Sequence, residues 1–348
     1  MKVLTWLDGR REEINAGLPY ATMDYFIGMP RSQLRYMPQD AVSLSWRVKQ
    51  EEPDVVMVNI GAVGIYAAQV ARRMRKKVIC RMGGHIYDEQ RSSRLWYQDK
   101  RLFQRAKNDV YFKTMHWVLR YCDAIIVVSE EMRHKFIMES GISPDKVHVV
   151  TVPCDYLRYD LPKVKVLAKT IITVSTVDYW QKVDGVLRVV GATSRLLKSY
   201  VGLRHLVVIP GRYHSMIANI LKGHYGELVR RGKLVICEYS DNIPAMLAES
   251  SVMVYWSELD GCPNVVLEAF ASRTPLIVNR CRWSVEMIPP DCAIKVENQN
   301  QMVDHLEYYL FDLPRADDDM VNRAYQFVQR EHSTAKVGAQ LAKVLESL

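Results

Sequence analysis

The sequence predicts an α/β protein with two parallel-sheet domains. Short runs rich in β-branched residues alternate with longer helical patterns along the chain. The runs are apolar throughout, as expected of parallel strands that helices cover on both faces. About nine runs are too many for one compact sheet of four to six strands, and 348 residues are more than a single core usually spans. Two Rossmann-like domains therefore fit the chain better than one.

Each strand is predicted from one apolar run. The first run is Val3–Leu7, which Asp8 and Gly9 end, so it is interpreted as a strand and not as a signal peptide. The predicted strands that follow it, in chain order, are Val55–Ile60, Lys77–Cys80, Ala124–Val128, Val147–Val152, Thr170–Val174, Leu206–Ile209, Leu234–Cys237, Val252–Tyr255 and Pro275–Val278.

One uncharged stretch, Val55–Ala71, resembles a membrane span at first sight. It is shorter than the roughly 20 apolar residues that cross a bilayer, and Gly61 and Gly64 divide it. A buried strand, a glycine turn and a buried helix explain it better. The basic run that follows, Arg72–Lys77, suits the C-terminus of that helix because cations oppose the negative end of the helix dipole.

The boundary between the two domains is predicted in the segment Pro153–Lys169. This segment contains two prolines and several charges and has no clear periodicity. The predicted domains are residues 1–160 and 161–330, facing a cleft between them that suits a large ligand. The seven cysteines are scattered and never spaced as C-x-x-C, which indicates a reducing, cytoplasmic setting.

The loop after the predicted strand Val252–Tyr255 carries the most specific chemical signal. Ligands of such sheets bind beyond the carboxyl ends of the strands. Gly261 and Pro263 make a turn, and Cys262 or Asn264 then begins a helix. Asp260 lies in the turn and Glu268 in the helix, so both carboxylates can face one pocket. Carboxylates bind hydroxyl groups and a helix N-terminus binds phosphate, so the pattern suits a nucleotide sugar. The alternative is that the acids only cap the helix.

The segment Ser257–Ala269 resembles the E-x7-E motif of the group 1 retaining glycosyltransferases, which have the GT-B fold. Asp260 stands where that family has its first glutamate. Other segments resemble the family in the same order along the chain, namely Val127–Glu130, Gly141–Val147, Val150–Pro153, Asn242–Ala248 and Tyr325–Leu348. The resemblance implies an acceptor domain at 1–160, with a C-terminal helix at about 331–348 packing back on it, and a donor domain at 161–330.

The resemblance also implies roles for individual residues. Asp260 lies by the donor sugar, Glu268 binds the ribose hydroxyls, and Lys182 neutralises the diphosphate. The arginine that accompanies this lysine in the family is absent, because Ser175 and Thr176 replace its Gly-Arg pair. The remaining residues expected at the donor are Thr176, Gly261, Cys262, Pro263, Asn264, Glu286 and Arg212, the last as a substitute for the missing arginine.

The sequence also predicts local features at Arg273 and His85. Arg273 stands where the family has a glycine, and a left-handed cap disfavours other residues, so the helix before it is expected to end differently. In the first domain, Gly83 and Gly84 let the backbone approach a ligand and turn His85 toward it. A histidine near this point contacts the donor sugar in similar enzymes, and the alternative is an ordinary histidine at a strand end.

Charge is distributed unevenly along the chain. Residues 1–165 hold 27 Lys and Arg against 19 Asp and Glu, whereas residues 166–348 hold 20 of each, so the net charge of +8 lies in the first half. The segment Glu89–Tyr121 combines basic and aromatic residues. It suits a peripheral contact with an anionic membrane or a lipid-linked acceptor, and it equally suits single-stranded nucleic acid. Of the two partners, the lipid surface is the one expected here. The alternative is a solvated helix whose aromatic residues belong to the core.

The predicted function is therefore glycosyl transfer with retention from a UDP or GDP sugar. No cofactor is expected, and no metal, because Asp317–Asp319 is explained as acids at a helix N-terminus. The enzyme is expected in the cytoplasm, peripheral on the inner face of the membrane. Two alternatives stay open: a nucleotide-sugar or polyanion-binding protein with impaired catalysis, and another GT-B activity such as a nucleotide-sugar epimerase.

Overall fold

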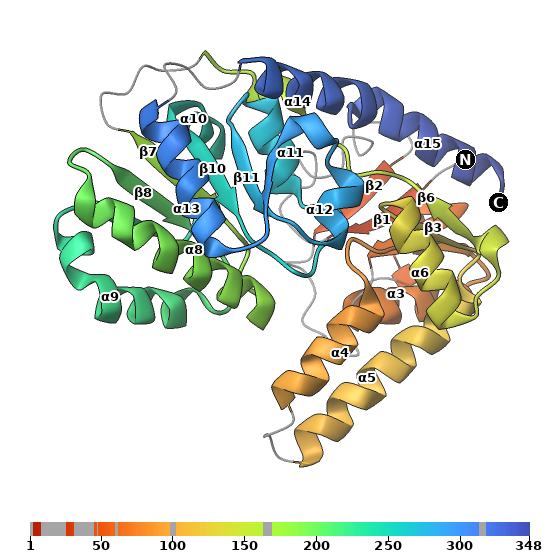
Figure 1. Ribbon diagram of the computed structural model, residues 1–348. Helices are drawn as coiled ribbons and strands as arrows, with labels where there is room; N and C mark the ends of the chain where they lie inside the picture. The colour runs from red at the N-terminus through yellow and green to blue at the C-terminus, as the bar shows by residue number, and fades with distance from the viewer. Residues whose placement is uncertain are drawn as a thin grey trace. The chain divides into compact units, whose positions relative to one another are not determined.

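The computed structural model describes residues 3–7, 26–30, 45–46, 48–59, 62–97, 102–162, 169–312 and 318–348. The chain forms two compact units. The first is Met1–Asp155 together with Glu331–Leu348, and the second is Tyr156–Arg330. In the described part of the chain, each unit is built on a six-stranded sheet whose neighbouring strands are all parallel (Figure 1).

The first sheet has the strand order β2-β1-β3-β4-β5-β6. In chain order its strands are β1 (Val3–Leu7), β2 (Phe26–Pro30), β3 (Val55–Asn59), β4 (Lys77–Arg81), β5 (Ala124–Val127) and β6 (Val147–Val149). The helices of this unit are α3 (Ala62–Arg73), α4 (Ile86–Tyr97), α5 (Leu102–Tyr121), α6 (Glu130–Ser140) and α15 (Thr334–Glu346), with a 3₁₀ turn at Pro144–Lys146. Figure 1 shows α4 and α5 as a helical hairpin that extends away from the sheet.

The second sheet has the strand order β12-β11-β10-β7-β8-β9. Its strands are β7 (Thr170–Val174), β8 (Arg204–Val208), β9 (Leu234–Cys237), β10 (Val252–Tyr255), β11 (Leu276–Asn279) and β12 (Ile294–Val296). The helices are α7 (Tyr156–Tyr159), α8 (Trp180–Ser199), α9 (His214–Arg230), α10 (Ile243–Glu249), α11 (Asn264–Ala271), α12 (Arg282–Met287), α13 (Gln299–Glu307) and α14 (Asp318–Glu331), with a 3₁₀ turn at Pro290–Cys292 and a π-helical turn at Tyr308–Asp312.

The prediction of two parallel α/β domains is confirmed. Every predicted apolar run contains a strand, and most of the boundaries agree within two residues. The strands β2 and β12 were not predicted, and both lie at the edges of their sheets. β12 is only three residues long, and β2 contains Gly28 and Pro30, which are typical of edge strands and weaken the sequence signal.

The segment predicted as a linker is partly helical. The helix α7 lies inside it and contacts α10 and α11, so it belongs to the second unit. The boundary between the units consequently falls between Asp155 and Tyr156, a few residues before the predicted one.

The end of the chain belongs to the first unit. Val337, Leu341 and Val344 of α15 are buried in the same core as Val3 and Val55. The backbone N–H of Thr151 donates to the side-chain oxygen of Gln340 at 3.0 Å. These contacts join the last helix to the strands of the first sheet.

The expectation that α11 ends without a left-handed cap is wrong. Arg273 has φ 50°, and the N–H of Thr274 bonds to the carbonyl of Ala269 at 2.9 Å, which closes the helix end. The side chain explains why arginine is tolerated at this position. The Arg273 guanidinium pairs with Asp160 and lies 3.7 Å from the ring centroid of Tyr325, whose hydroxyl donates to Asp160 at 2.7 Å. These contacts offset a backbone cost of roughly 1 kcal/mol.

A fully buried histidine in the second core predicts a pH-dependent stability. His205 of β8 is 0% exposed, and its ring nitrogens lie 3.0 and 2.9 Å from the hydroxyls of Thr173 and Thr193. Burial lowers the pKa of His205 from 6.5 to about 3. As the pH falls below 6.5 the unfolded chain binds a proton that the folded protein does not, so stability is full above 6.5 and is lost on acidification.

We expect His205 alone to reduce the free energy of unfolding by about 2 kcal/mol between pH 7 and pH 5. Urea unfolding of the protein and of His205→Gln at both pH values measures this. The difference between the two pH values should shrink by about that amount in the variant, even if the variant is less stable overall. An identical pH dependence in both proteins would contradict the assignment.

Candidate functional site

Three polar side chains meet in the second unit at the carboxyl end of β10. The Lys182 Nζ lies 2.5 Å from Oδ2 of Asp260 and also contacts the hydroxyl of Tyr255. The Tyr255 hydroxyl donates to the same Asp260 oxygen at 2.8 Å. The side chains of Lys182 and Asp260 are 13% and 15% exposed, so the pair is largely but not fully removed from water. The structure therefore brings together two of the residues predicted for catalysis.

A close helix approach places Lys182 there. Gly185 lies one turn after Lys182 in α8, and a Cβ added at this glycine would lie 2.1 Å from the carbonyl oxygen of Trp256. Only a residue without a side chain lets α8 approach the end of β10 this closely. The pairing of β7 with β10 brings α8, which follows β7, beside the loop that holds Asp260.

Tyr255 is a site residue that the sequence reasoning missed. Burial, together with the negative charge of Asp260, raises the pKa of Tyr255 well above its usual value. The phenol therefore stays protonated and acts as a hydrogen-bond donor to the carboxylate. The signal that could have found it is its position as the last residue of a predicted strand, directly before the loop.

The loop that carries Asp260 is held by a buried polar network. The side chain of Asn279 accepts from the N–H of Ser257 at 2.9 Å and donates to the carbonyl of Ser257 at 3.2 Å. The indole N–H of Trp283 donates to the same carbonyl at 2.8 Å. A loop fixed at its base in this way positions its polar groups before a ligand arrives.

Glu268 lies in α11 and is partly buried. Burial raises the pKa of this carboxyl, while a hydrogen bond from Tyr159 and the charge of Arg158 act in the opposite direction. The two carboxylates of the motif thus have different partners, Tyr159 for Glu268 and Lys182 for Asp260.

The other predicted donor residues of this loop lie at the start of α11. Gly261, Cys262 and Pro263 are buried and Asn264 is exposed. The helix begins after Pro263, which supplies no side-chain cap. The N–H of Val266 donates to the Pro263 carbonyl at 3.1 Å, and the N–H groups of Asn264 and Val265 point out of the helix end.

Two unpartnered polar groups lie at the ends of neighbouring strands in the second unit. The hydroxyl of Ser175 and the indole N–H of Trp256 are buried, and neither has a hydrogen-bond partner within the described part of the chain. Ser175 follows β7 and Trp256 follows β10. Buried donors without a partner are rare and point to a ligand or an ordered water.

Three predicted residues have other surroundings. Thr176 is exposed beside Ser175. The Arg212 guanidinium donates to the backbone carbonyl of Asp178 at 2.5 Å and lies 4.9 Å from the ring centroid of Tyr213. Glu286 is exposed on α12 and lies 3.4 Å from Nε of Arg282.

In the first unit, His85 follows the carboxyl end of β4. Its side chain is 9% exposed, and its Nδ1 lies 3.4 Å from Oδ2 of Asp88. That contact lacks hydrogen-bond geometry, and neither ring nitrogen is hydrogen-bonded within the described residues. Burial lowers the pKa of His85 to about 4, although the charge of Asp88 acts in the opposite direction. The imidazole is therefore neutral near pH 7 and can donate from one nitrogen and accept at the other.

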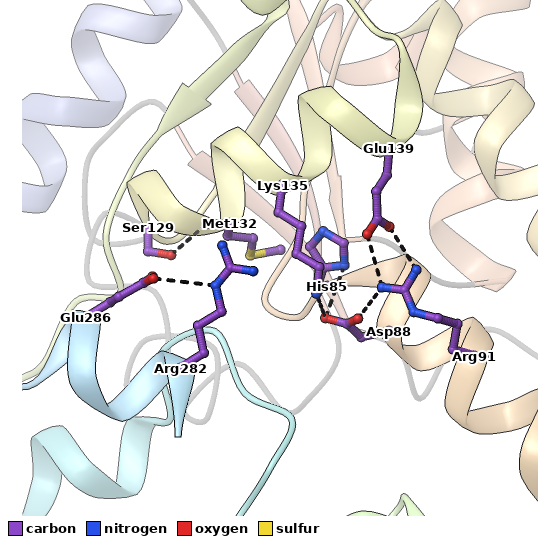
Figure 2. A network of polar contacts seen from close by, with 9 residues as sticks. All are labelled: His85, Asp88, Arg91, Ser129, Met132, Lys135, Glu139, Arg282 and Glu286. Atoms are coloured by element: carbon purple, nitrogen blue, oxygen red, sulfur yellow. Dashed lines mark hydrogen bonds and ion pairs between the residues drawn. The ribbon is translucent and has the colours of Figure 1, made fainter. Parts of the chain in front are cut away.

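Asp88 is held by two cations. Figure 2 shows its carboxylate in contact with Lys135 of α6 and Arg91 of α4, and Arg91 also pairs with Glu139 at 3.1 Å. Burial acts to raise the pKa of Asp88, but the contacts with Lys135 and Arg91 outweigh it and keep this pKa below its usual value. The network fixes a carboxylate beside a neutral histidine whose nitrogens are available to a ligand.

The described residues show neither a metal-binding group nor a membrane-spanning helix. Among them, no group of three or more His, Cys, Asp or Glu side chains is arranged to hold a metal ion. In the same ranges no helix combines the length and hydropathy needed to cross a bilayer. Asp317, the first acid of the run Asp317–Asp319, lies outside the described residues.

Comparison with known families supports the fold. The profile described as Glycosyltransferase Family 4 matches residues 4–155, and the profile described as Glycosyl transferases group 1 matches residues 168–312. The two matches follow the two units of the structure. The chain belongs to the glycosyltransferases of the GT-B fold.

Individual relatives of this glycosyltransferase are distant. A viral protein (isolate Australia/Victoria) named "Putative glycosyltransferase ORF31" is 29% identical over 109 residues, which are 31% of this chain and 32% of the viral protein. The match therefore spans about a third of that curated relative.

Solved structures of this fold match over the whole chain. HepE of Anabaena in complex with UDP-glucose has a TM-score of 0.79 at 11% identity and covers 100% of both chains. An α,α-trehalose-phosphate synthase (UDP-forming) from Burkholderia vietnamiensis has a TM-score of 0.70 at 12% identity, again over 100% of both chains. At these identities the likeness concerns the fold alone.

Proposed function

We propose that this glycosyltransferase moves a sugar from a UDP or GDP sugar to an acceptor, with retention at the anomeric carbon and without a metal ion. The observation that carries the proposal is the cluster of Lys182, Asp260 and Tyr255 beside the start of α11. The cluster supplies a fixed cation and a fixed carboxylate next to helix N–H groups. A nucleoside diphosphate leaving group and a sugar hydroxyl need these groups.

In the proposed reaction, the bond from the anomeric carbon to the phosphate oxygen breaks and the acceptor oxygen bonds to the same face of that carbon. The acceptor proton passes to the leaving phosphate, so no protein nucleophile is required. Lys182 and the first-turn N–H groups of α11 stabilise the charge that develops on the diphosphate. Glu268 binds the ribose hydroxyls, and Asp260 orients Lys182 and lies by the donor sugar.

His85 supplies the contribution of the first unit. We propose that its neutral imidazole hydrogen-bonds a hydroxyl of the donor sugar. Asp88 stays ionised between Lys135 and Arg91, and this charge favours the tautomer with the proton on Nδ1. The Nε2 atom is then free to accept a hydrogen bond from the sugar.

A second candidate is a nucleotide-sugar-binding protein with impaired catalysis. The arginine that accompanies Lys182 in the family is replaced by Thr176, and Arg212 is engaged by the Asp178 carbonyl. Of the cations predicted for the diphosphate, Lys182 and Arg212, only Lys182 is then fixed beside the Asp260 loop. This candidate predicts donor binding without turnover.

The proposed activity is tested by first ranking UDP and GDP sugars by thermal shift and then measuring donor consumption with and without saccharide acceptors. Proton NMR of the product reports the anomeric configuration, and we expect the configuration of the donor. Inversion would contradict retention, and binding without donor hydrolysis or transfer would favour the second candidate.

Metal dependence is measured in the same assay. We expect activity in excess EDTA to stay within about twofold of that in buffer, because Lys182 and the helix N-terminus neutralise the diphosphate. Loss of activity that manganese or magnesium restores would show a metal requirement and would contradict this part of the proposal.

A further inference from the structure

An exposed apolar stripe runs along α5 in the first unit. Val110, Trp117 and Tyr121 are 62%, 51% and 49% exposed, and their spacing of seven and four residues places them on one helix face. The rings of Trp117 and Tyr121 contact each other, with centroids 4.7 Å apart and planes tilted by 55°. The outer face of a helix that packs on a core is normally polar, so this stripe calls for a covering partner.

A groove lies between this end of α5 and α3. Its volume is about 450 Å³. Most of its walls are apolar, and two arginines from the last turn of α3 complete them. The lining residues are Ala68, Gln69, Arg72, Arg73, Val78, Trp117, Val118, Tyr121 and Cys122.

Exposed cations surround the groove and the stripe. Lys113 and Arg120 lie within about one turn of Trp117 on α5, and both are exposed. The turn after α3 adds further cations, as the segment Arg72–Lys77 contains five basic residues and Met74. Asp123 pairs with Arg72 and with Lys77 at 3.5 Å each, which leaves a strong positive excess.

This surface is separate from the candidate site of the first unit. Val78 lies at the start of β4 and Cys122 directly before β5, so the groove is at the amino ends of the parallel strands. His85 follows the carboxyl end of β4. Changes at the groove therefore test a surface and leave the proposed chemistry intact.

We propose that the α3–α5 surface, formed by Arg72, Arg73, Lys113, Trp117, Arg120 and Tyr121, binds a lipid bilayer that contains anionic phospholipids. Trp and Tyr favour the depth of the headgroups because their rings are apolar and their N–H and O–H groups stay hydrated. Arginine and lysine side chains beside them attract lipid phosphates. The groove accepts apolar chain atoms below the arginines. The inference does not depend on the proposed donor site.

Two other partners fit the surface less well. A second copy of the chain packed on the same face through a twofold axis would place Arg72, Arg73 and Arg120 against their own copies, which like-charge repulsion disfavours. Single-stranded nucleic acid needs ring faces free for stacking on successive bases, whereas the rings of Trp117 and Tyr121 contact each other with planes tilted by 55°, and Val110 offers no stacking surface.

Of the predicted segment Glu89–Tyr121, only the C-terminal part, from Val110 to Tyr121, contributes to this surface. Arg101 lies outside the described residues, and the side chains of Arg105 and Lys107 are not described. The test therefore uses positions whose exposure is established.

The full chain is sedimented with vesicles of phosphatidylcholine alone and of phosphatidylcholine mixed with phosphatidylglycerol. We expect binding to the mixed vesicles only, weakening steeply as salt is raised from low to physiological ionic strength. Arg73→Glu combined with Arg120→Glu should weaken it by about tenfold or more. Lys198→Glu combined with Lys222→Glu changes the net charge equally at exposed positions of the second unit and should leave binding unchanged.

Tryptophan fluorescence gives an independent readout. Binding to mixed vesicles should shift the emission to the blue, and Trp117→Phe should lose most of the shift while still sedimenting.

The proposal is overturned by equal binding to neutral vesicles, by no binding at low salt, or by an equal loss of binding in the control pair. Binding of a single-stranded oligonucleotide without vesicle binding, or a stable dimer by light scattering that loses its contact in Trp117→Ala, would also overturn it.

Discussion

Replacing Lys182 with alanine is expected to lower kcat/KM for sugar transfer by about 10²–10³-fold. Enzymes show a loss of this size when one preorganised group that stabilises developing charge is removed. The substitution removes the cation proposed for the diphosphate and also leaves Asp260 with Tyr255 as its remaining partner in the cluster. The loss should fall mainly on kcat, because the charge on the phosphate grows as the bond breaks.

Steady-state kinetics with the best donor measure this effect. Arg188→Ala is a matched control, since Arg188 lies six residues further along α8, is exposed, and pairs with Asp184 at 2.5 Å. Tyr255→Phe retains the ring and removes the hydroxyl donor to Asp260, so it should give a smaller loss. Full activity of Lys182→Ala would remove the cluster from the catalytic site, and a comparable loss in Arg188→Ala would point to damage of α8.

The second large effect is expected at Glu268. Glu268→Ala should weaken UDP or GDP binding by about 1.5–3 kcal/mol, which corresponds to roughly 10–150-fold in Kd, because a charged hydrogen-bond acceptor for the ribose is removed. Isothermal calorimetry with both nucleotides measures it. Glu249→Ala, an exposed glutamate at the end of α10, is the control.

Glu268 also predicts that nucleotide affinity depends on pH. Burial raises the pKa of Glu268, so its carboxylate is lost at a higher pH than an exposed glutamate would be. Nucleotide affinity should therefore fall as the pH is lowered through this raised pKa, and Glu268→Gln should remove that part of the dependence. Unchanged affinity in Glu268→Ala, for the nucleotide that binds better, would exclude the proposed ribose contact.

The sequence alone determined the fold class and the positions of most strands along the chain. A strand buried on both faces must be apolar along its length, so local composition reports it directly. One edge strand of each sheet was not predicted, because β2 contains glycine and proline and β12 has only three residues. The short helix α7 was not predicted either, since four residues are too few to show a helical period.

The partnerships within the candidate site were decided by the tertiary structure. The spacing of Asp260 and Glu268 could be read from one loop and one helix, whereas Lys182 is 78 positions from Asp260 and Arg273 is 113 positions from Asp160. Such contacts depend on which strands become neighbours and on how closely helices pack, as at Gly185 against Trp256. Local patterns report burial and turns, but the pairing of β7 with β10 is a property of the whole sheet, and it brought Lys182 to the carboxylate that Tyr255 contacts from the end of β10.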